Sequence, residues 1–256
     1  ILYCTMGTLK EMARNKTPLE WMQQYEIIAV DECHERSLDL DEGTAYIREL
    51  LRKCAGNPAC PIVVYMSATF DIDKYAEYFE TDQSNSVLVE GGAISRDFFY
   101  LDKESINMFQ EAADLVMKLH KENLSDIDTY NDILIFTIGD GEIRKIKKLI
   151  EEQDKEKELY ILSASATIYN SGGPEPDEIE RLPLDEIRQK YDRPNIKRRV
   201  IIATPVVETG LTVKTLKYVI YTGMVKATLY APTHNLESLI TQPCSLSSLE
   251  QRGGRA

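Results

Sequence analysis

The chain is organised around the stretch IIAVDECHERS, residues 27–37. Its first four residues are apolar and mostly β-branched, which predicts a short buried strand. Two adjacent carboxylates, Asp31 and Glu32, follow at the carboxyl end of that strand, where open α/β sheets bind ligands. An Asp there can hold Mg²⁺ on the phosphates of a nucleotide, and a Glu beside it can orient and deprotonate an attacking water. These residues alone leave a second interpretation open, in which acidic side chains merely end a strand at the surface.

The composition is that of a globular protein with a sizeable core. A length of 256 residues predicts one large domain or two of ordinary size, with 43% hydrophobic and 28% charged residues. The formal net charge of −12 excludes a generally basic coat for nucleic acid, although it leaves room for a local basic groove. No apolar run is long enough to span a bilayer, so no membrane partner is expected.

The cysteines and the two ends of the chain suggest a compartment and a context. Five cysteines are widely scattered without paired CxxC spacing, which argues against a disulfide framework or a zinc site. Free thiols predict a reducing, intracellular location, in the cytoplasm or the nucleus. The chain opens at Ile1 inside an apolar run, shows no signal sequence, and stops at Ala256. We therefore expect a fragment of a longer polypeptide.

Strands and helices are predicted to alternate along the chain, which indicates parallel, doubly wound α/β sheets. We place a domain boundary near residue 100, giving domains 1–100 and 101–256. In the second domain, residues 225–230 and 236–241 alternate as a β-hairpin. Residues 163–194, rich in Gly, Pro and acidic side chains, predict a long surface insertion with one helix near 184–190.

Polar residues follow other predicted strands as well. Ser67 and Thr69 come directly after the strand at 61–66, again at the ligand edge of a sheet. The turn at Thr5 and Gly7 offers a hydroxyl and backbone amides to a phosphate oxygen, although these residues alone favour a plain strand-to-helix turn capped by Thr8. Near the end of the chain, two arginines spaced with glycines could reach a phosphate across a cleft.

Taken in order, these segments resemble the motifs of a superfamily 2 helicase of the DEAH/DExH-box type. The matching segments are 5–7 for motif Ib, 31–37 for motif II, 66–69 for motif III, 132–142 for motif IV and its hook turn, 203–212 for motif V, and 251–255 for the start of motif VI. The resemblance covers nearly the whole chain apart from 163–194. It implies two tandem RecA-like domains with parallel sheets and a β-hairpin in the second domain.

The resemblance also implies an enzyme, an ATP-dependent RNA helicase that uses ATP or another NTP with Mg²⁺. Asp31 and Glu32 would hold the metal, and Glu32 would orient the attacking water. His34 would bridge to Gln251 across the cleft between the domains, and Arg255 would stabilise charge on the γ-phosphate. Gln251 and Arg255 would also contact the nucleotide.

Further roles follow from the same resemblance. Ser67 and Thr69 would couple hydrolysis to the nucleic-acid side. Thr209 and Gly210 would contact the nucleotide. The candidates for contact with RNA, single-stranded or duplex with an overhang, are Thr5, Gly7, Gly139, Thr204 and Thr212. Such contacts go mostly to phosphate and sugar. The hairpin would help to separate strands at a duplex junction.

The chain departs from the family pattern in three places. Met6 stands where motif Ib usually has Asp, and Pro205 stands where motif V usually has Asn. No phosphate-binding loop of the form G-x-x-x-x-G-K-[ST] occurs, so this fragment alone should bind ATP poorly and hydrolyse little. The presence of Pro205 in motif V and of Cys33 in motif II is similar to the motif pattern of viral DExH enzymes. This suggests the hypothesis of a poxvirus-like or other large-DNA-virus origin, with action in the virion or the infected-cell cytoplasm.

Two other functions stay open at this point. One is a non-hydrolysing nucleic-acid-binding platform descended from a helicase, against which the intact Glu32 argues because a platform needs no general base. The other is a DNA helicase or translocase on the same engine, since contacts to the 2′-hydroxyl are not readable from sequence. Protein partners cannot be identified from the sequence.

Overall fold

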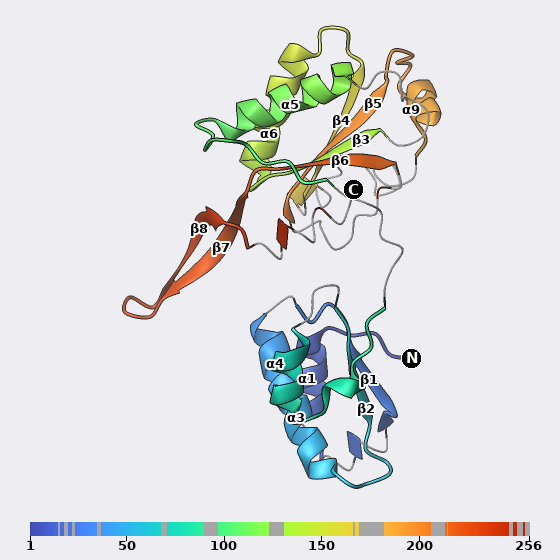
Figure 1. Cartoon of the computed structure of the whole chain (residues 1–256), viewed down its shortest axis with the longest axis vertical. Coiled ribbons are helices and arrows are strands. Elements are labelled where there is room, and N and C mark those ends of the chain that lie inside the picture. The colour runs from blue at the N-terminus through green and yellow to red at the C-terminus, as the bar shows by residue number, and fades with distance from the viewer. Residues whose placement is uncertain are drawn as a thin grey trace. The chain divides into compact units, whose positions relative to one another are not determined.

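We analysed a computed structural model of the chain. It describes residues 1–14, 16–17, 20–21, 24–34, 37–67, 71–89, 97–122, 131–165, 167–168, 182–205, 213, 215–245, 248–249 and 253. The chain divides into two compact units, Ile1–Ala93 and Ile94–Ala256, shown in Figure 1. The sequence places a boundary near residue 100, whereas the structure divides after Ala93.

The first unit is built on two parallel strands, β1 (Ile27–Val30) and β2 (Ile62–Tyr65). Their register pairs Ile27 with Ile62 and Val30 with Tyr65, so both strands end at the same edge. Burial alternates along β1, with Ile28 and Val30 buried and Ile27 60% exposed, as expected where one face of a sheet meets the core. The other elements of this unit are α1 (Met6–Arg14), α3 (Leu38–Cys54), α4 (Ile72–Phe79) and the 3₁₀ helix η1 (Gln83–Asn85).

Helix α3 begins directly after the central stretch because its sequence carries start and stop signals. The Ser37 hydroxyl caps the helix by accepting a hydrogen bond from the Leu40 amide at 3.2 Å. Acidic residues occupy its first turn and basic residues its last, which suits the helix dipole. Its apolar stripe, which includes Ile47 and Leu50, packs in one cluster with Ile28 and Val30. This packing fixes α3 against the strand that precedes it.

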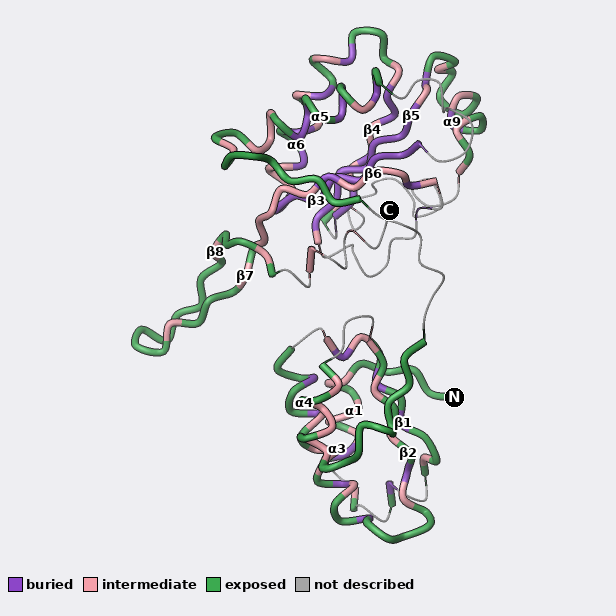
Figure 2. Tube along the Cα trace, viewed as in Figure 1, coloured by how far each residue is buried: buried purple, intermediate pink, exposed green. Residues whose placement is uncertain are grey.

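The second unit contains a four-stranded parallel sheet in the order β4-β5-β3-β6. The strands are β3 (Asp132–Phe136), β4 (Leu159–Ala164), β5 (Arg198–Ala203) and β6 (Leu216–Tyr221). Helices α5 (Met108–Glu122) and α6 (Asp140–Gln153) cover one face, and α9 (Leu184–Lys190) packs on the other. The two central strands are buried along their whole length, as Figure 2 shows. Burial on both faces explains their continuous apolar sequence.

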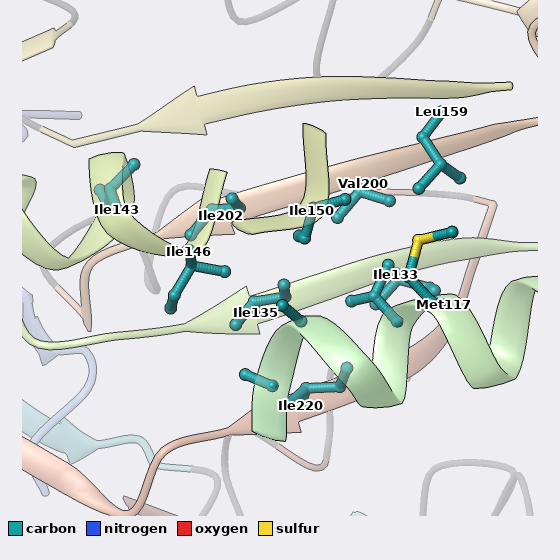
Figure 3. Packing of buried hydrophobic residues seen from close by; sticks show 13 residues of the cluster. Met117, Ile133, Ile135, Ile143, Ile146, Ile150, Leu159, Val200, Ile202 and Ile220 are labelled. Atoms are coloured by element: carbon teal, nitrogen blue, oxygen red, sulfur yellow. The ribbon is translucent and has the colours of Figure 1, made fainter. Parts of the chain in front are cut away.

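Alternate residues of the central strands supply two separate cores. Ile133 and Ile135 point with Val200 and Ile202 to the layer of α5 and α6, where Ile143, Ile146 and Ile150 meet them (Figure 3). The intervening residues pack in a second cluster that includes Ile187 of α9. The parallel α/β fold predicted from the sequence is therefore observed in both units.

The structure corrects both ends of the predicted surface insertion at 163–194. Ser163 and Ala164 are the last residues of β4 and pair with Ile202 and Ala203 of β5. At the other end, α9 lies where the sequence places a helix, but its Ile187 is completely buried against the sheet. Because the segment between these ends is rich in acidic and turn-forming residues, the sequence did not show that its two ends pack on the sheet. Residues 169–181 lie outside the described residues.

Two adjacent arginines begin β5 inside the protein, at 0% exposure for Arg198 and 2% for Arg199. The Arg199 guanidinium donates to Asp132 Oδ2 from Nε at 2.8 Å and from Nη2 at 2.6 Å. Thr215 shares this carboxylate oxygen and also accepts from Arg199 Nη2 at 2.8 Å. Arg198 donates to the Asn131 side chain, and burial lowers the pKa of its guanidinium. The amino ends of β3 and β5 are thus joined by charged hydrogen bonds.

A second polar cluster ties α5 to the amino end of β4. Glu158 forms an ion pair with Lys197 and lies 2.9 Å from Nε2 of the buried His120. The Lys197 ammonium, aided by His120 and opposed by partial burial, lowers the pKa of the Glu158 carboxyl. The ionised carboxylate is therefore the form that the folded protein favours.

We expect Glu158→Gln to lower stability at neutral pH and to have little effect in acid. Because the pKa of Glu158 is lowered by folding, its stabilising contribution is complete above the ordinary glutamate pKa of about 4.3 and is lost as pH falls through the folded-state value. Urea unfolding at pH 7, 5, 4 and 3 should show a midpoint gap between wild type and variant that closes toward pH 3. Glu156→Gln, at an exposed neighbouring site, is the control. A gap that stays constant from pH 7 to 3 would contradict the assignment.

The sheet is followed by an antiparallel hairpin, β7 (Met224–Ala231) and β8 (Leu236–Pro243). This confirms the hairpin predicted from the alternating sequence. Its loop occupies residues 232–235, where Asn235 has a positive φ of 48°, a conformation that Asn tolerates well. Among the described helices, none has both the length and the apolar character required to cross a bilayer.

Candidate nucleotide and nucleic-acid site

The strand end after β1 is held on both sides by backbone hydrogen bonds to the segment after β2. The Met66 amide donates to the Val30 carbonyl at 2.8 Å, and the Cys33 amide donates to the Met66 carbonyl at 3.1 Å. These two bonds clamp the intervening Asp31 and Glu32 into a tight turn. The sequence therefore presents two carboxylates at a fixed place on the carboxyl edge of the sheet.

The backbone of Glu32 is strained, with a positive φ of 51°. A non-glycine residue in such a sparsely populated conformation costs about 1–3 kcal/mol and persists only where its surroundings hold it. Here the clamp and a hydrogen bond from the Glu32 amide to Asp31 Oδ1, 2.9 Å long, do so. The Glu32 side chain stays 44% exposed, so its carboxylate can meet a ligand from solvent.

His34 joins the two strand ends. Its Nδ1 lies 2.8 Å from the Ser67 hydroxyl and 3.4 Å from Glu32 Oε2. The imidazole is 14% exposed, and its buried Nε2 has no hydrogen-bond partner among the described residues. The structure thus brings together three residues singled out from the sequence: His34 is hydrogen-bonded to Ser67 and lies close to the Glu32 carboxylate.

Sequence reasoning missed one residue that supports this group. The Tyr75 hydroxyl of α4 donates to the Cys33 carbonyl at 3.1 Å, so it holds the middle of the central stretch. The Tyr75 ring lies 5.6 Å from that of Tyr65. Cys33 itself is fully buried, which raises the pKa of its thiol and leaves it a packing residue.

Thr5 and Gly7 lie in the first turn of α1 or just before it. The Thr5 hydroxyl accepts a hydrogen bond from the Thr8 amide at 3.2 Å, which is the geometry of a helix N-cap. The sequence-based cap at Thr8 was therefore one turn too late. Thr5 is exposed, and the amides of this turn form the positive end of α1, a suitable place for a phosphate oxygen.

In the second unit, Gly139 and Thr204 lie at the carboxyl edge of the sheet and both are buried. The Thr137 amide donates to the Ala203 carbonyl at 2.9 Å, so the chain segments leading to the two residues are directly joined. Gly139 precedes α6 as its N-cap, and a Cβ there would lie 2.8 Å from Lys226 Nζ. Lys226, which comes from β7 and which the sequence did not single out, therefore covers the start of α6.

Six of the predicted site residues lie outside the described residues. They are Thr69, Thr209, Gly210, Thr212, Gln251 and Arg255. Their roles stay predictions.

The sequence has named relatives over its whole length. It is 34% identical over 271 residues to "Putative RNA Helicase B962L" of African swine fever virus, an alignment that covers 100% of this chain and 28% of the relative. It is 29% identical to ATP-dependent RNA helicase DHX33 of Mus musculus, over 92% of this chain and 32% of the relative. The chain is homologous to DEAH/DExH RNA helicases. No family model matches the chain.

Solved helicase structures share the fold of this chain. The DExH-box NTPase HrpB of E. coli matches with a TM-score of 0.71 and 23% identity, over 97% of this chain and 28% of that protein. This likeness confirms the RecA-like α/β fold. The assignment of Glu32, His34 and Ser67 to motifs II and III stays a prediction from the sequence. The chain spans little more than a quarter of the viral relatives that it matches.

Proposed function

We propose that the protein is an NTP-dependent RNA helicase, of which this chain supplies parts of the two motor domains. The group of Glu32, His34 and Ser67 at the carboxyl edge of β1 and β2 carries this proposal, because it places the exposed Glu32 carboxylate near His34, which is hydrogen-bonded to Ser67. The relatives named as RNA helicases and ATP-dependent RNA helicases support it.

Asp31 and Glu32 suit Mg²⁺ bound to a nucleotide, because hard carboxylate oxygens at an exposed turn are the ligands that Mg²⁺ accepts, often through water. When bound, the ion would neutralise charge that develops on the transferred phosphoryl group. Asp31 would hold it, and Glu32 would orient a water and take its proton. His34 contacts both Glu32 and Ser67, so a change at the nucleotide site would shift His34 and, through it, the end of β2. Gln251 and Arg255 would complete the site from the second domain, with Thr209 and Gly210 at the nucleotide.

The nucleic-acid contacts of this proposal come from hydroxyls, helix N-termini and one lysine. Thr5 and Gly7 would bind the RNA backbone from the first unit. In the second unit the start of α6 at Gly139, with the Lys226 ammonium over it, and Thr204 would bind phosphate and sugar. Thr212 would act beside them, and Thr69 would couple the two sites. Contacts of this kind do not depend on base sequence, which suits a protein that moves along a strand.

We expect the full-length protein to hydrolyse ATP in the presence of Mg²⁺ and single-stranded RNA to stimulate this hydrolysis. The measurement is steady-state phosphate release with no nucleic acid, with poly-uridine RNA, and with a DNA strand of the same length and bases. Stimulation by RNA above that by DNA supports the RNA helicase. Stronger stimulation by DNA would make it a DNA translocase, and nucleic-acid binding without hydrolysis would make it a binding platform.

A further inference from the structure

Helix α1 is fastened to α3 by a contact that only glycine allows. A Cβ on Gly43, in the second turn of α3, would lie 2.3 Å from Met6 Sδ and 2.6 Å from Met6 Cγ. The thioether of Met6 therefore rests directly on the backbone of α3. Glycine within a helix is destabilising by roughly 0.5–1 kcal/mol relative to alanine. A glycine at this place is consistent with a need for close approach.

Two neighbouring contacts keep the same helices in register. A Cβ on Gly7 would lie 3.1 Å from Asp39 Oδ2, so α1 also meets the first turn of α3 closely. Lys10, one turn further along α1, donates to Asp39 Oδ1 at 2.8 Å and also pairs with Glu42. Helices α1 and α3 thus meet along about two turns at the end of α3 that follows motif II.

This contact lies between the two proposed sites of the first unit. Met6 stands between Thr5 and Gly7 in sequence, at the turn proposed to bind RNA. Helix α3 begins at Leu38, just after the group of Glu32 and His34, and its start is fixed by the Ser37 cap. Because packed interiors are dense and transmit strain, a shift at the strand end would move α3 and, through Gly43, Met6.

We propose that Met6, seated on Gly43, is a positioning residue that couples RNA contact at the turn of α1 to hydrolysis at the strand end. Met6 touches neither ligand in this proposal. Through the contact of Met6 with Gly43, the Thr5–Gly7 turn moves together with α3. The proposal rests on the proposed RNA-stimulated NTPase activity. It also accounts for a departure from the family pattern. Met6, which replaces the Asp of motif Ib, packs its apolar side chain on α3 at Gly43.

The test compares Met6→Ala and Gly43→Ala with wild type in the full-length protein, measuring basal and RNA-saturated ATP hydrolysis. Met6→Ala removes the thioether that contacts Gly43, and Gly43→Ala adds a Cβ that displaces this thioether. We expect RNA stimulation of kcat to fall roughly 2- to 30-fold in both, with basal kcat and the KM for ATP unchanged. Met6→Leu, which conserves volume, should retain wild-type stimulation. Lys53→Ala, in the exposed last turn of α3, controls for substitution in that helix.

Each outcome decides the matter. Normal stimulation in both alanine variants would overturn the proposal, and so would an equal fall of basal and stimulated rates, because that marks a structural role. If Gly43→Ala unfolds in a thermal melt, Met6→Ala with its Met6→Leu rescue decides alone. A wild-type protein that RNA does not stimulate would instead remove the proposed function itself, so the two failures are distinguishable.

Discussion

Replacing Glu32 by glutamine is expected to lower ATP hydrolysis by about 10²- to 10⁴-fold while nucleotide and RNA binding persist. Glutamine keeps the size of the side chain and can occupy the strained turn, but its amide cannot take a proton from water. The carboxylate is exposed and lies 3.4 Å from His34 Nδ1, so the substitution removes a charge without emptying a packed core. The measurement is single-turnover hydrolysis with saturating RNA, beside equilibrium binding of a fluorescent nucleotide.

Glu49→Gln provides a matched control for this experiment. Glu49 is an exposed residue of α3 whose carboxylate pairs with Arg52, so its loss should leave hydrolysis within twofold of wild type. Hydrolysis that survives in Glu32→Gln would show that Glu32 is not the base. Loss of nucleotide binding together with hydrolysis would instead mean that Glu32 acts mainly by holding Mg²⁺.

The second large effect concerns stability. Asp132→Asn is expected to lower the free energy of unfolding of the second unit by about 3–5 kcal/mol, because it removes a counter-charge from a guanidinium that is only 2% exposed. Both hydrogen bonds from Arg199 to Asp132 reach a single oxygen, which an amide can present only without its charge. Urea unfolding at pH 7, followed by circular dichroism, measures the change.

Two further variants make this stability test specific. Asp132→Asn combined with Arg199→Met should cost much less than the sum of the two single changes, because the buried charge leaves with its partner. Asp185→Asn breaks an exposed pair with Arg188 one turn away and should change stability by less than about 1 kcal/mol. An Asp132→Asn protein as stable as wild type would show that the pair contributes nothing.

The part of the site that could be read from the sequence depends on one general rule. Parallel strands end at a common edge, so the polar residues after 27–30 and after 61–66 were both expected at the ligand edge of a sheet, although 33 residues separate His34 from Ser67. The observed His34–Ser67 contact follows from the strand register. The alternating pattern of apolar residues was equally sufficient for the hairpin.

Features that depend on register or on local backbone strain could not be read in this way. Nothing near Arg198 and Arg199 shows that they are buried, because their partners lie 67 residues earlier on a neighbouring strand. Only the pairing of Ile133 with Val200 places Asp132 beside Arg199. The positive φ of Glu32 likewise arises from hydrogen bonds on both sides of the turn, and one of these requires Met66 of the next strand segment.

The β7–β8 hairpin bears on how the chain behaves at high concentration. In the part of the chain that the structure describes, β7 and β8 pair with each other alone, so each eight-residue strand has an outer row of amides and carbonyls about 27 Å long. Leu229, Leu236 and Leu239 are 51–65% exposed along it. Such an edge can accept a strand from another molecule. Lys226 and Pro243, which disfavour such pairing, lie only at the end of the hairpin near the sheet. The tip half is thus open to strand addition from another molecule, which favours aggregation at high concentration.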